Sequence, residues 1–166
     1  MLLAMKIHPL LEQHYKAVAD IYTEGINTGN ATFETGAVDW STWDKNHLSH
    51  SRLIAQEEDK VIGWAAISPV SGRCVYGGVA EVSVYVRQDH RGKGVGKALL
   101  LELIRQSEAN GIWTLQSGIF PENASSIKIH EQCGFRIVGY REKVGKMNGI
   151  WRNTVLLEKR SAVAGI

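Results

Sequence analysis

The segment Arg91-Gly92-Lys93-Gly94-Val95-Gly96-Lys97 decides how this chain is interpreted. Residues 79–86, just before it, alternate between a face that carries Glu81 and Tyr85 and a face of alanine and valine, as a half-buried strand does. Residues 98–104, just after it, are strong helix formers. A glycine loop between a strand and a helix gathers unpaired N–H groups at the positive end of the helix dipole, which is typical of a phosphate-binding site.

The spacing of these glycines excludes the two most familiar phosphate-binding motifs. The dinucleotide fingerprint Gly-x-Gly-x-x-Gly fails because Lys97 stands where the third glycine belongs. The Walker A loop fails because Arg91 occupies its first glycine position and Ala98 replaces the hydroxyl residue that would bind magnesium. The loop therefore binds another kind of phosphate, or else it is a glycine-rich turn that simply starts a helix.

The residues around this loop predict one domain of mixed α/β class. Apolar residues recur at helical spacing from Leu11 to Tyr22, and Ser41 is expected to cap a second helix that runs to His50. The charged turn at residues 57–60 favours a hairpin. We expect strands at 6–9, 51–57, 60–67, 79–86, 113–119, 135–146 and 151–158, and helices at 11–22, 41–50, 98–110 and 123–133.

Length and composition limit the classes of protein to consider. With 166 residues, 44% of them hydrophobic, the chain is expected to fold as one domain over residues 1–160, followed by a loose tail at 161–166. A net charge of +2 is too even to suggest nucleic-acid binding. We find no run of about 20 apolar residues and no export signal, so we expect neither membrane insertion nor secretion.

The cysteines and histidines give no pattern of a metal site. Cys74 and Cys133 are the only cysteines and lie far apart, so we expect two reduced thiols and a cytoplasmic protein. His47 and His50 have a spacing that could bracket a metal, but no third ligand accompanies them. We therefore expect no metal cofactor.

The pattern Arg91-x-x-Gly94-x-Gly96 after an alternating strand resembles the acyl-CoA pyrophosphate loop of the GNAT N-acetyltransferase superfamily. Two later segments strengthen the resemblance: Asn123-Ala124-Ser125-Ser126 at a helix start, and His130-Glu131-Gln132-Cys133-Gly134-Phe135 turning into a strand. The resemblance implies the GNAT fold, a central mixed and mostly antiparallel sheet flanked by about four helices. It also implies acetyl-CoA as the co-substrate.

Within that superfamily, the chain resembles the phosphinothricin and methionine sulfoximine N-acetyltransferases over nearly its whole length. The similar stretches are residues 31–34, 73–76, 80–86, 90–94 and 144–146. Residues 73–86 look closest to members that acetylate arsinothricin. The chain departs from the branch at Gly77-Gly78, where many members have a bulky pair, and at residues 146–151.

The resemblance implies two sets of acetyl-CoA contacts. The backbone of the glycine loop would hold the pyrophosphate, and backbone N–H groups of the preceding strand would stabilise the oxyanion if that strand splays from its neighbour. The residues implied are Val84, Tyr85, Val86, Arg91, Gly92, Lys93, Gly94, Val95, Gly96, Lys97, Asn123 and Ser126.

Glu81 and His130 are the candidate catalytic residues. An α-amino group is mostly protonated at pH 7, so a base near the nucleophile helps the reaction. Glu81 matches the family's catalytic glutamate, and we expect a raised pKa, a bridging water, or both; the alternative is a solvated glutamate. His130 stands where many GNAT proteins place a tyrosine acid and could protonate the CoA thiolate, unless it is a half-buried packing histidine.

Arg73 is the candidate for selecting the substrate. An arginine fork matches the two oxygens of an amino-acid carboxylate, and Arg73 occupies that family position; the alternative is a solvated loop arginine. The other substrate contacts implied are Phe33, Val75, Glu81, Val82 and Ser83, with Phe33 and Tyr85 as apolar walls or ordinary core residues.

The expected activity is transfer of acetyl from acetyl-CoA to the α-amino group of a small amino-acid analogue, directly within a ternary complex. Neither cysteine lies in the glycine loop or on the strand of Glu81, so no covalent relay is evident. Alternatives are a GNAT enzyme that acetylates a polyamine, an aminoglycoside or a protein N-terminus, and a non-catalytic acyl-CoA-binding module. The resemblance also implies a homodimer.

Overall fold

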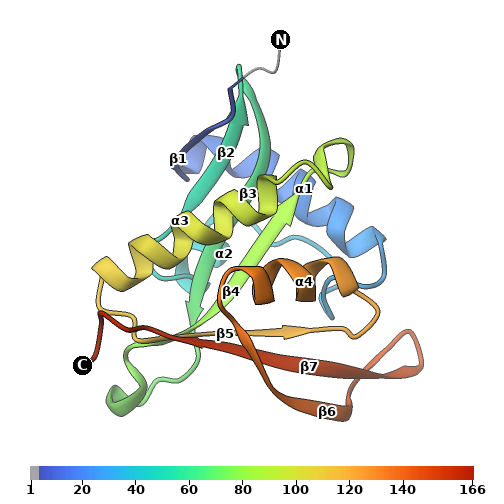
Figure 1. Cartoon of the computed structure of the whole chain (residues 1–166). Helices are drawn as coiled ribbons and strands as arrows, with labels where there is room; N and C mark the ends of the chain where they lie inside the picture. The colour runs from blue at the N-terminus through green and yellow to red at the C-terminus, as the bar shows by residue number, and fades with distance from the viewer. Residues whose placement is uncertain (1–3) are drawn as a thin grey trace.

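The computed structural model describes residues 4–166 and contains one seven-stranded sheet with helices on both faces (Figure 1). Residues 1–3, which the sequence analysis assigned to the start of the domain, lie outside the described residues. The strands are β1 (Lys6–Pro9), β2 (Leu53–Glu57), β3 (Lys60–Pro69), β4 (Val79–Val86), β5 (Thr114–Ile119), β6 (Arg136–Met147) and β7 (Ile150–Arg160). The α-helices are α1 (Tyr15–Asn27), α2 (Trp40–Asn46), α3 (Val95–Ala109) and α4 (Ala124–Gln132).

The strand order is β1-β2-β3-β4-β5-β7-β6. Among the described strands, only β4 and β5 run parallel, joined by the crossover through α3; all other neighbours are antiparallel. The hairpin expected between residues 51–57 and 60–67 is β2 and β3. The mixed, mostly antiparallel sheet with four flanking helices confirms the expected fold class.

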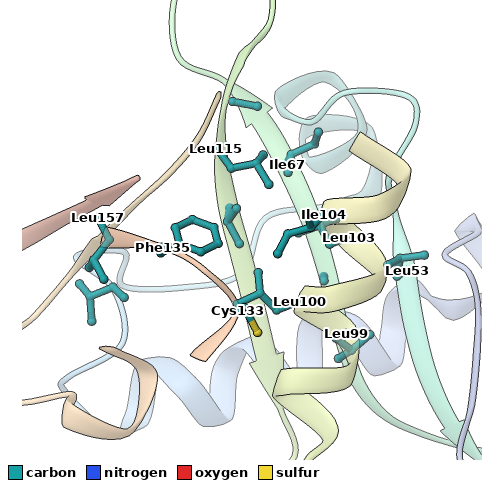
Figure 2. Packing of buried hydrophobic residues seen from close by; sticks show 14 of the residues in the cluster. Leu53, Ile67, Leu99, Leu100, Leu103, Ile104, Leu115, Cys133, Phe135 and Leu157 are labelled. Carbon is teal, nitrogen blue, oxygen red and sulfur yellow. The ribbon is translucent and has the colours of Figure 1, made fainter. Parts of the chain in front are cut away.

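The two faces of the sheet bury separate apolar clusters. On the α3 face, Leu99, Leu100 and Leu103 of α3 pack against strand residues such as Ile67, as Figure 2 shows. On the α1 face, Ile21 of α1 packs in a cluster with tryptophans of α2 and β3. The alternation read from residues 79–86 therefore sends alanine and valine to the α3 face and Tyr85 to the α1 face.

Gly78, one of the residues that departs from the related branch, makes room for a tryptophan. A Cβ atom built on Gly78 would lie 2.0 Å from the Trp113 ring, closer than real atoms approach. The carbonyl of Gly78 also accepts the amides of Trp113 and Thr114 at 2.8 and 3.1 Å. The absence of a side chain at position 78 thus lets the start of β5 lie against the start of β4.

Three local expectations were wrong. The first helix runs from Tyr15 to Asn27 rather than from Leu11 to Tyr22. The second helix is capped by Asp39, whose carboxylate accepts the Thr42 amide at 2.9 Å, and the helix ends at Asn46 rather than His50. Asp39 is as good a cap as Ser41 and lies two residues earlier. The tail at 161–166 is also not loose, because the Arg160 guanidinium donates to the carbonyls of Ser161, Ala164 and Gly165.

Candidate active site

The glycine loop after β4 leaves its backbone open to a ligand. Gly92 and Gly94 have φ angles of +74° and +84°, in the left-handed region that favours glycine. A Cβ atom at either position would meet nothing within 4 Å. The glycines therefore do not accommodate a neighbouring protein group. They let the chain turn sharply into α3, whose N-cap is Gly94.

The amide groups of this loop converge at the start of α3. Within residues 4–166, the backbone N–H groups from Gly92 to Lys97 have no hydrogen-bond partner in the protein, and Gly94 offers no side-chain cap. Unpaired amides at the positive end of a fifteen-residue helix form an anion site. The pyrophosphate of acetyl-CoA fits this donor set, and the exposed Lys93 and Lys97 add positive charge beside it.

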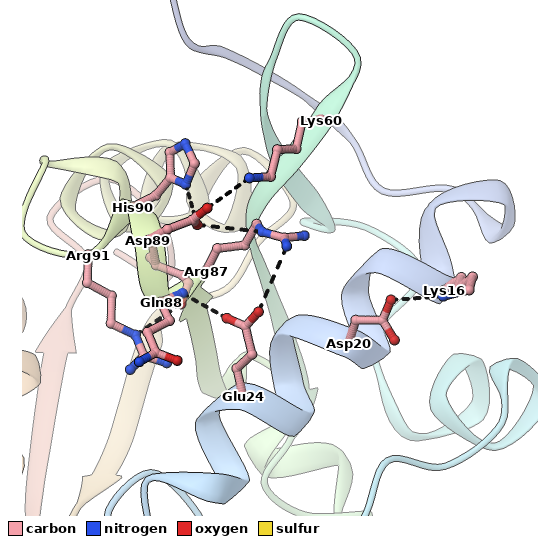
Figure 3. Close-up of polar contacts among 10 residues, drawn as sticks. Lys16, Asp20, Glu24, Lys60, Arg87, Gln88, Asp89, His90 and Arg91 are labelled. Atoms are coloured by element: carbon pink, nitrogen blue, oxygen red, sulfur yellow. Dashed lines mark hydrogen bonds and ion pairs between the residues drawn. The ribbon is translucent and has the colours of Figure 1, made fainter.

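Polar contacts anchor the loop to three other elements (Figure 3). The Arg91 side chain donates from Nε to the Val86 carbonyl at 3.2 Å, which ties the loop back to the end of β4. Asp89 accepts from Lys60 of β3 at 2.9 Å, and Glu24 of α1 accepts the Gln88 amide at 2.7 Å. The start of the loop is thus fixed to β3, β4 and α1.

Asp89 has a second contact that keeps it charged. The His90 ring lies 2.6 Å from one Asp89 oxygen and 3.2 Å from the Glu57 carboxylate. Hydrogen bonds from Lys60 and His90 hold the pKa of Asp89 well below its usual range. The contacts of Asp89 therefore persist throughout the neutral pH range.

The parallel ladder between β4 and β5 is short, so β4 separates from this neighbour as expected. The two strands pair only at Val79↔Thr114, Ala80↔Leu115 and Glu81↔Gln116. Beyond Glu81, β4 continues to Val86 while pairing with β3, and β5 continues to Ile119 while pairing with β7. A gap therefore opens between the two central strands.

The register shows which amides face the gap. Arg87 donates to the Ile62 carbonyl and Val70 donates to the Val79 carbonyl, so odd-numbered residues of β4 exchange hydrogen bonds with β3. Even-numbered residues point their N–H groups the other way. Val84 and Val86 thus aim their amides at the gap, as expected. The expectation for Tyr85 was wrong, because its amide belongs to the β3 side.

Glu81 lies where the ladder ends and the gap begins. Its side chain is exposed, and one carboxylate oxygen accepts a hydrogen bond from Gln116 Nε2 at 3.3 Å. Gln116 is the residue paired with Glu81 on β5. The structure thus places a carboxylate, oriented by an amide, beside the gap that Val84 and Val86 face.

Arg73 lies on the loop that leads into β4. Its side chain is exposed, and its guanidinium carbon is 5.6 Å from the centre of the Tyr76 ring. Within residues 4–166 the guanidinium makes no ion pair or hydrogen bond, so its donors are available to a ligand. Val75, two residues further along, is 65% exposed on the same loop.

The remaining expected substrate residues divide between the two faces of the sheet. Ser83 shares the face of Glu81 and is partly exposed. Val82 is 7% exposed and packs in the core on the α3 face, so its side chain does not line a pocket shared with Glu81. Phe33 is 37% exposed and lies edge-on to Phe120, with ring centres 4.8 Å apart.

The Tyr85 ring packs against α1. It stacks on Trp64 with ring centres 5.1 Å apart and meets the Tyr22 ring edge-on at 4.9 Å. A Cβ atom on Gly25 would lie 2.8 Å from the ring, so glycine at that position permits the approach. Burial raises the pKa of the Tyr85 hydroxyl, which therefore stays protonated.

His130 is buried, which matches the packing alternative for this residue. It is 4% exposed, its ring meets Phe135 edge-on at 5.0 Å, and Nδ1 lies 2.7 Å from the Ser126 carbonyl. Because a carbonyl only accepts, Nδ1 carries the proton, and the buried Nε2 has no hydrogen-bond partner. Burial lowers the pKa of His130, so the ring is neutral near pH 7. Its role as an acid stays a prediction.

Asn123 and Ser126 form the start of α4. The Asn123 side chain accepts the Ser126 amide at 3.4 Å and so caps the helix. Ile129 of α4 lies 3.6 Å from a Cβ position built on Gly96, which brings α4 alongside the start of α3. The two segments that the resemblance assigned to acetyl-CoA are therefore neighbours.

Other candidate sites have separate explanations. Within residues 4–166, His, Cys, Asp and Glu side chains do not gather in threes around a possible metal position. His47 contacts the Trp43 carbonyl, and His50 contacts Ser51. Cys74 is exposed and Cys133 buried, both as free thiols. No helix in the described part of the chain is long and apolar enough to cross a membrane.

A pocket of about 390 Å³ lies elsewhere, between β1, α2 and the end of α3. Its lining includes His50, Ser51 and Arg52 and none of residues 91–97. The Arg52 guanidinium is already occupied by Asp44 and by the His47 and Leu48 carbonyls. Because this pocket is lined neither by the glycine loop nor by Glu81, the candidate site is the gap between β4 and β5.

Sequence reasoning missed two polar residues with long-range contacts. Gln116 orients Glu81, and Arg152 of β7 links the segment after α1 to the loop between β5 and α4. Both contacts depend on strand pairing and on chain segments more than 30 residues apart. No local pattern in the sequence signals them.

The comparisons with known proteins agree with this geometry. The family model described as acetyltransferase (GNAT) family matches residues 15–135. An L-methionine sulfoximine/L-methionine sulfone acetyltransferase of Pseudomonas paraeruginosa is 37% identical over 147 residues, covering 83% of this chain and 84% of the relative.

Two solved structures resemble the whole chain. A GNAT superfamily phosphinothricin acetyltransferase from Sinorhizobium meliloti, in complex with acetyl-CoA, has a TM-score of 0.86 and 28% identity, covering 97% of this chain and 90% of that one. A ribosomal-protein-alanine N-acetyltransferase from Brucella melitensis has a TM-score of 0.86 and 28% identity, covering 94% and 99%.

The buried state of His130 predicts how stability depends on pH. Burial lowers the pKa of His130 in the folded protein. Below about pH 6.5, the unfolded chain therefore binds a proton at His130 more readily than the folded chain does. The stability contributed by neutral His130 is thus complete above pH 6.5 and is lost as the pH falls. Urea unfolding at pH 7.5, 6.5 and 5.5 should show a steeper loss for the wild type than for His130→Gln. The control is the same substitution at an exposed histidine, His8→Gln. Equal losses of unfolding free energy with falling pH in wild type and His130→Gln would contradict the prediction.

Proposed function

Because this chain belongs to the GNAT family of N-acetyltransferases and uses acetyl-CoA as its co-substrate, we propose that it acetylates the α-amino group of a small amino-acid analogue. The observation that carries the proposal is the arrangement around the gap. Unpaired amides lie along one edge, the Glu81 carboxylate lies at its closed end, and the free Arg73 guanidinium lies on the loop before the same strand. The candidate substrates are phosphinothricin, methionine sulfoximine or sulfone, and arsinothricin.

The two ends of the gap are separated by a distance that acetyl-CoA must span. From Glu81 to the end of β4 at Val86 is five residues, or about 17 Å of extended strand. The pyrophosphate would bind at the glycine loop, and the pantetheine arm would run along the exposed edge of β4. In that position the thioester lies near the closed end, within reach of an amine beside Glu81.

In the proposed reaction, the neutral amine attacks the thioester carbonyl within a ternary complex. A C–N bond forms, the C–S bond breaks, and CoA leaves as a thiolate that needs only modest help because thiols have a pKa of about 8.5. Glu81, directly or through water, accepts the proton that the amine loses. The amide of Val84, which lies nearer to Glu81 than Val86 does, stabilises the oxyanion of the tetrahedral intermediate, and the Val86 amide binds the pantetheine arm. His130 stays a candidate acid only if it exchanges a proton through its buried Nε2.

Arg73 favours an amino acid over a polycation. Its uncommitted guanidinium can pair with a carboxylate through two parallel N–H groups. A polyamine or aminoglycoside would instead need carboxylates at that position, and Arg73 would repel it. The name of the Pseudomonas paraeruginosa relative supports an amino-acid analogue. The name of the Brucella melitensis structure supports a protein N-terminus as the second candidate substrate.

A homodimer and a cytoplasmic location stay part of the proposal. Six large apolar side chains are exposed along β6, the edge strand, and its neighbour β7. Such a surface is typical of a protein interface. Its residues are Ile137, Val138, Tyr140, Val144, Ile150 and Trp151. Resistance to an amino-acid toxin would follow from acetylation of its amine.

The substrate class is tested by release of free CoA from acetyl-CoA with phosphinothricin, methionine sulfoximine, arsinothricin, spermidine, an aminoglycoside and an alanine N-terminal peptide. We expect one of the amino acids to react with kcat/KM near 10⁴ M⁻¹s⁻¹, an order-of-magnitude figure typical of enzymes. Arg73→Ala should raise the KM for that amino acid roughly tenfold or more by removing the fork. Arg105→Ala, an exposed arginine on α3, is the matched control. Preference for spermidine or the peptide would reject the amino-acid proposal.

Replacing Glu81 tests the base. Glu81→Gln keeps the shape and the contact with Gln116 but cannot accept a proton, so kcat should fall about 10²–10⁴-fold. The Kd for acetyl-CoA, measured by calorimetry, should stay within about twofold because Glu81 lies far from the glycine loop. Glu108→Gln on α3 is the control. Unchanged kcat at saturating amine would remove Glu81 from the mechanism.

A further inference from the structure

Arg152 of β7 joins three segments that lie far apart in the sequence. Its Nη1 donates to the Gly29 carbonyl at 2.9 Å, and its Nη2 donates to Asn30 Oδ1 at 2.7 Å. The same Nη2 lies 3.4 Å from the Glu122 carboxylate. The guanidinium carbon stands 4.1 Å from the centre of the Phe120 ring, so the planar group covers that ring.

This environment excludes Arg152 as a binding group for a substrate carboxylate. Its side chain is only 13% exposed, and both terminal nitrogens already donate to protein oxygens. Arg73 differs, because its guanidinium contacts only an aromatic ring. The two arginines therefore have separate tasks, and that of Arg152 is to hold neighbouring chain segments together.

The segment that Arg152 holds carries Phe33. Residues 28–36 connect α1 to the segment before α2 and contain no helix or strand. The Phe33 ring lies edge-on to the Phe120 ring. A Cβ atom built on Gly145 would lie 2.7 Å from the Phe33 ring. Gly145 is the residue paired with Arg152 across β6 and β7. Phe33 thus lies between Phe120, which Arg152 covers, and Gly145, which is paired with Arg152.

We propose that Arg152 is a positioning residue for the amine pocket: it fixes residues 29–33 so that Phe33 forms one wall. The inference rests on the proposed function in one respect, namely that Phe33 faces the amine. Two hydrogen bonds to one segment and a stacked ring need the flat, forked guanidinium, which lysine cannot replace. Arg152 therefore acts on amine binding through Phe33 without touching the substrate.

The first test separates the two substrates kinetically. Arg152→Ala and Arg152→Lys should both raise the KM for the amine about tenfold, while the KM for acetyl-CoA stays within about twofold. Arg136→Ala is the matched control, because Arg136 also forms an ion pair with a glutamate. That pair bridges β6 and β7, and the Arg136 side chain is 71% exposed. Equal rises in both KM values would overturn the proposal. Asn30→Ala, at an exposed position, supplies a milder variant that preserves the ring contact.

The second test asks whether the effect passes through Phe33. If it does, Arg152→Ala added to Phe33→Ala should raise the amine KM less than twofold further, because the wall is already gone. Additive effects of the two substitutions would show that Arg152 acts by another route and would overturn the proposal.

A third measurement needs no substrate and so separates this inference from the substrate proposal. Hydrogen–deuterium exchange of residues 29–34 should be faster in Arg152→Ala than in wild type and unchanged in Arg136→Ala. Unchanged exchange in Arg152→Ala would overturn the inference even if an amino acid is acetylated. If wild type acetylates none of the amines tested, the substrate proposal fails, and faster exchange at residues 29–34 still supports the positioning role of Arg152.

Discussion

The separation of β4 from β5 after Glu81 is the constraint on which the rest of the structure depends. Each strand remains paired with its outer neighbour, β4 with β3 and β5 with β7, while their own parallel ladder has only three residue pairs. A backbone amide without a partner in the protein must bond to water or to a ligand, so the amides of Val84 and Val86 are open to a hydrogen-bond acceptor from outside the chain. An extended acyl-CoA arm supplies such acceptors. In the proposed function, the opening that costs the sheet its central ladder is also the binding site.

The charges are distributed to suit the two ends of this gap. At the open end, the amides at the start of α3 and the exposed lysines of the glycine loop supply positive charge, and contacts from Lys60 and Glu24 hold that loop in place. At the closed end, Glu81 supplies the only group of the described site suited to accept a proton from an amine, and Arg73 stays free for a carboxylate. In the proposed function, the sheet therefore fixes the distance between phosphate recognition and proton transfer, and side chains on loops determine which amine can enter.

Features encoded in consecutive residues were predictable, whereas features that depend on pairing were not. The alternation in residues 79–86 predicted β4 to the residue, and the glycine loop leads directly into a helix, as predicted. The Tyr85 amide faces β3 because of the register between β3 and β4, and the contact of Arg152 with Gly29 spans 123 residues. Neither feature leaves a local signal in the sequence. The second helix was assigned the wrong cap because Asp39 and Ser41 are equally suitable by type. The tail was misjudged because a single arginine, Arg160, gathers its carbonyls.

Amide-resolved hydrogen exchange, with and without acetyl-CoA, tests the central claim most directly. In the free protein, the amides of Val84 and Val86 should exchange quickly, while those of Ser83 and Tyr85, which bond to β3, should be protected. Acetyl-CoA should protect Val84, Val86 and the amides of residues 92–97 and leave Ser83 and Tyr85 unchanged. If Val84 and Val86 are already protected in the free protein, or stay unprotected with acetyl-CoA bound, the gap between β4 and β5 is not the acetyl-CoA site.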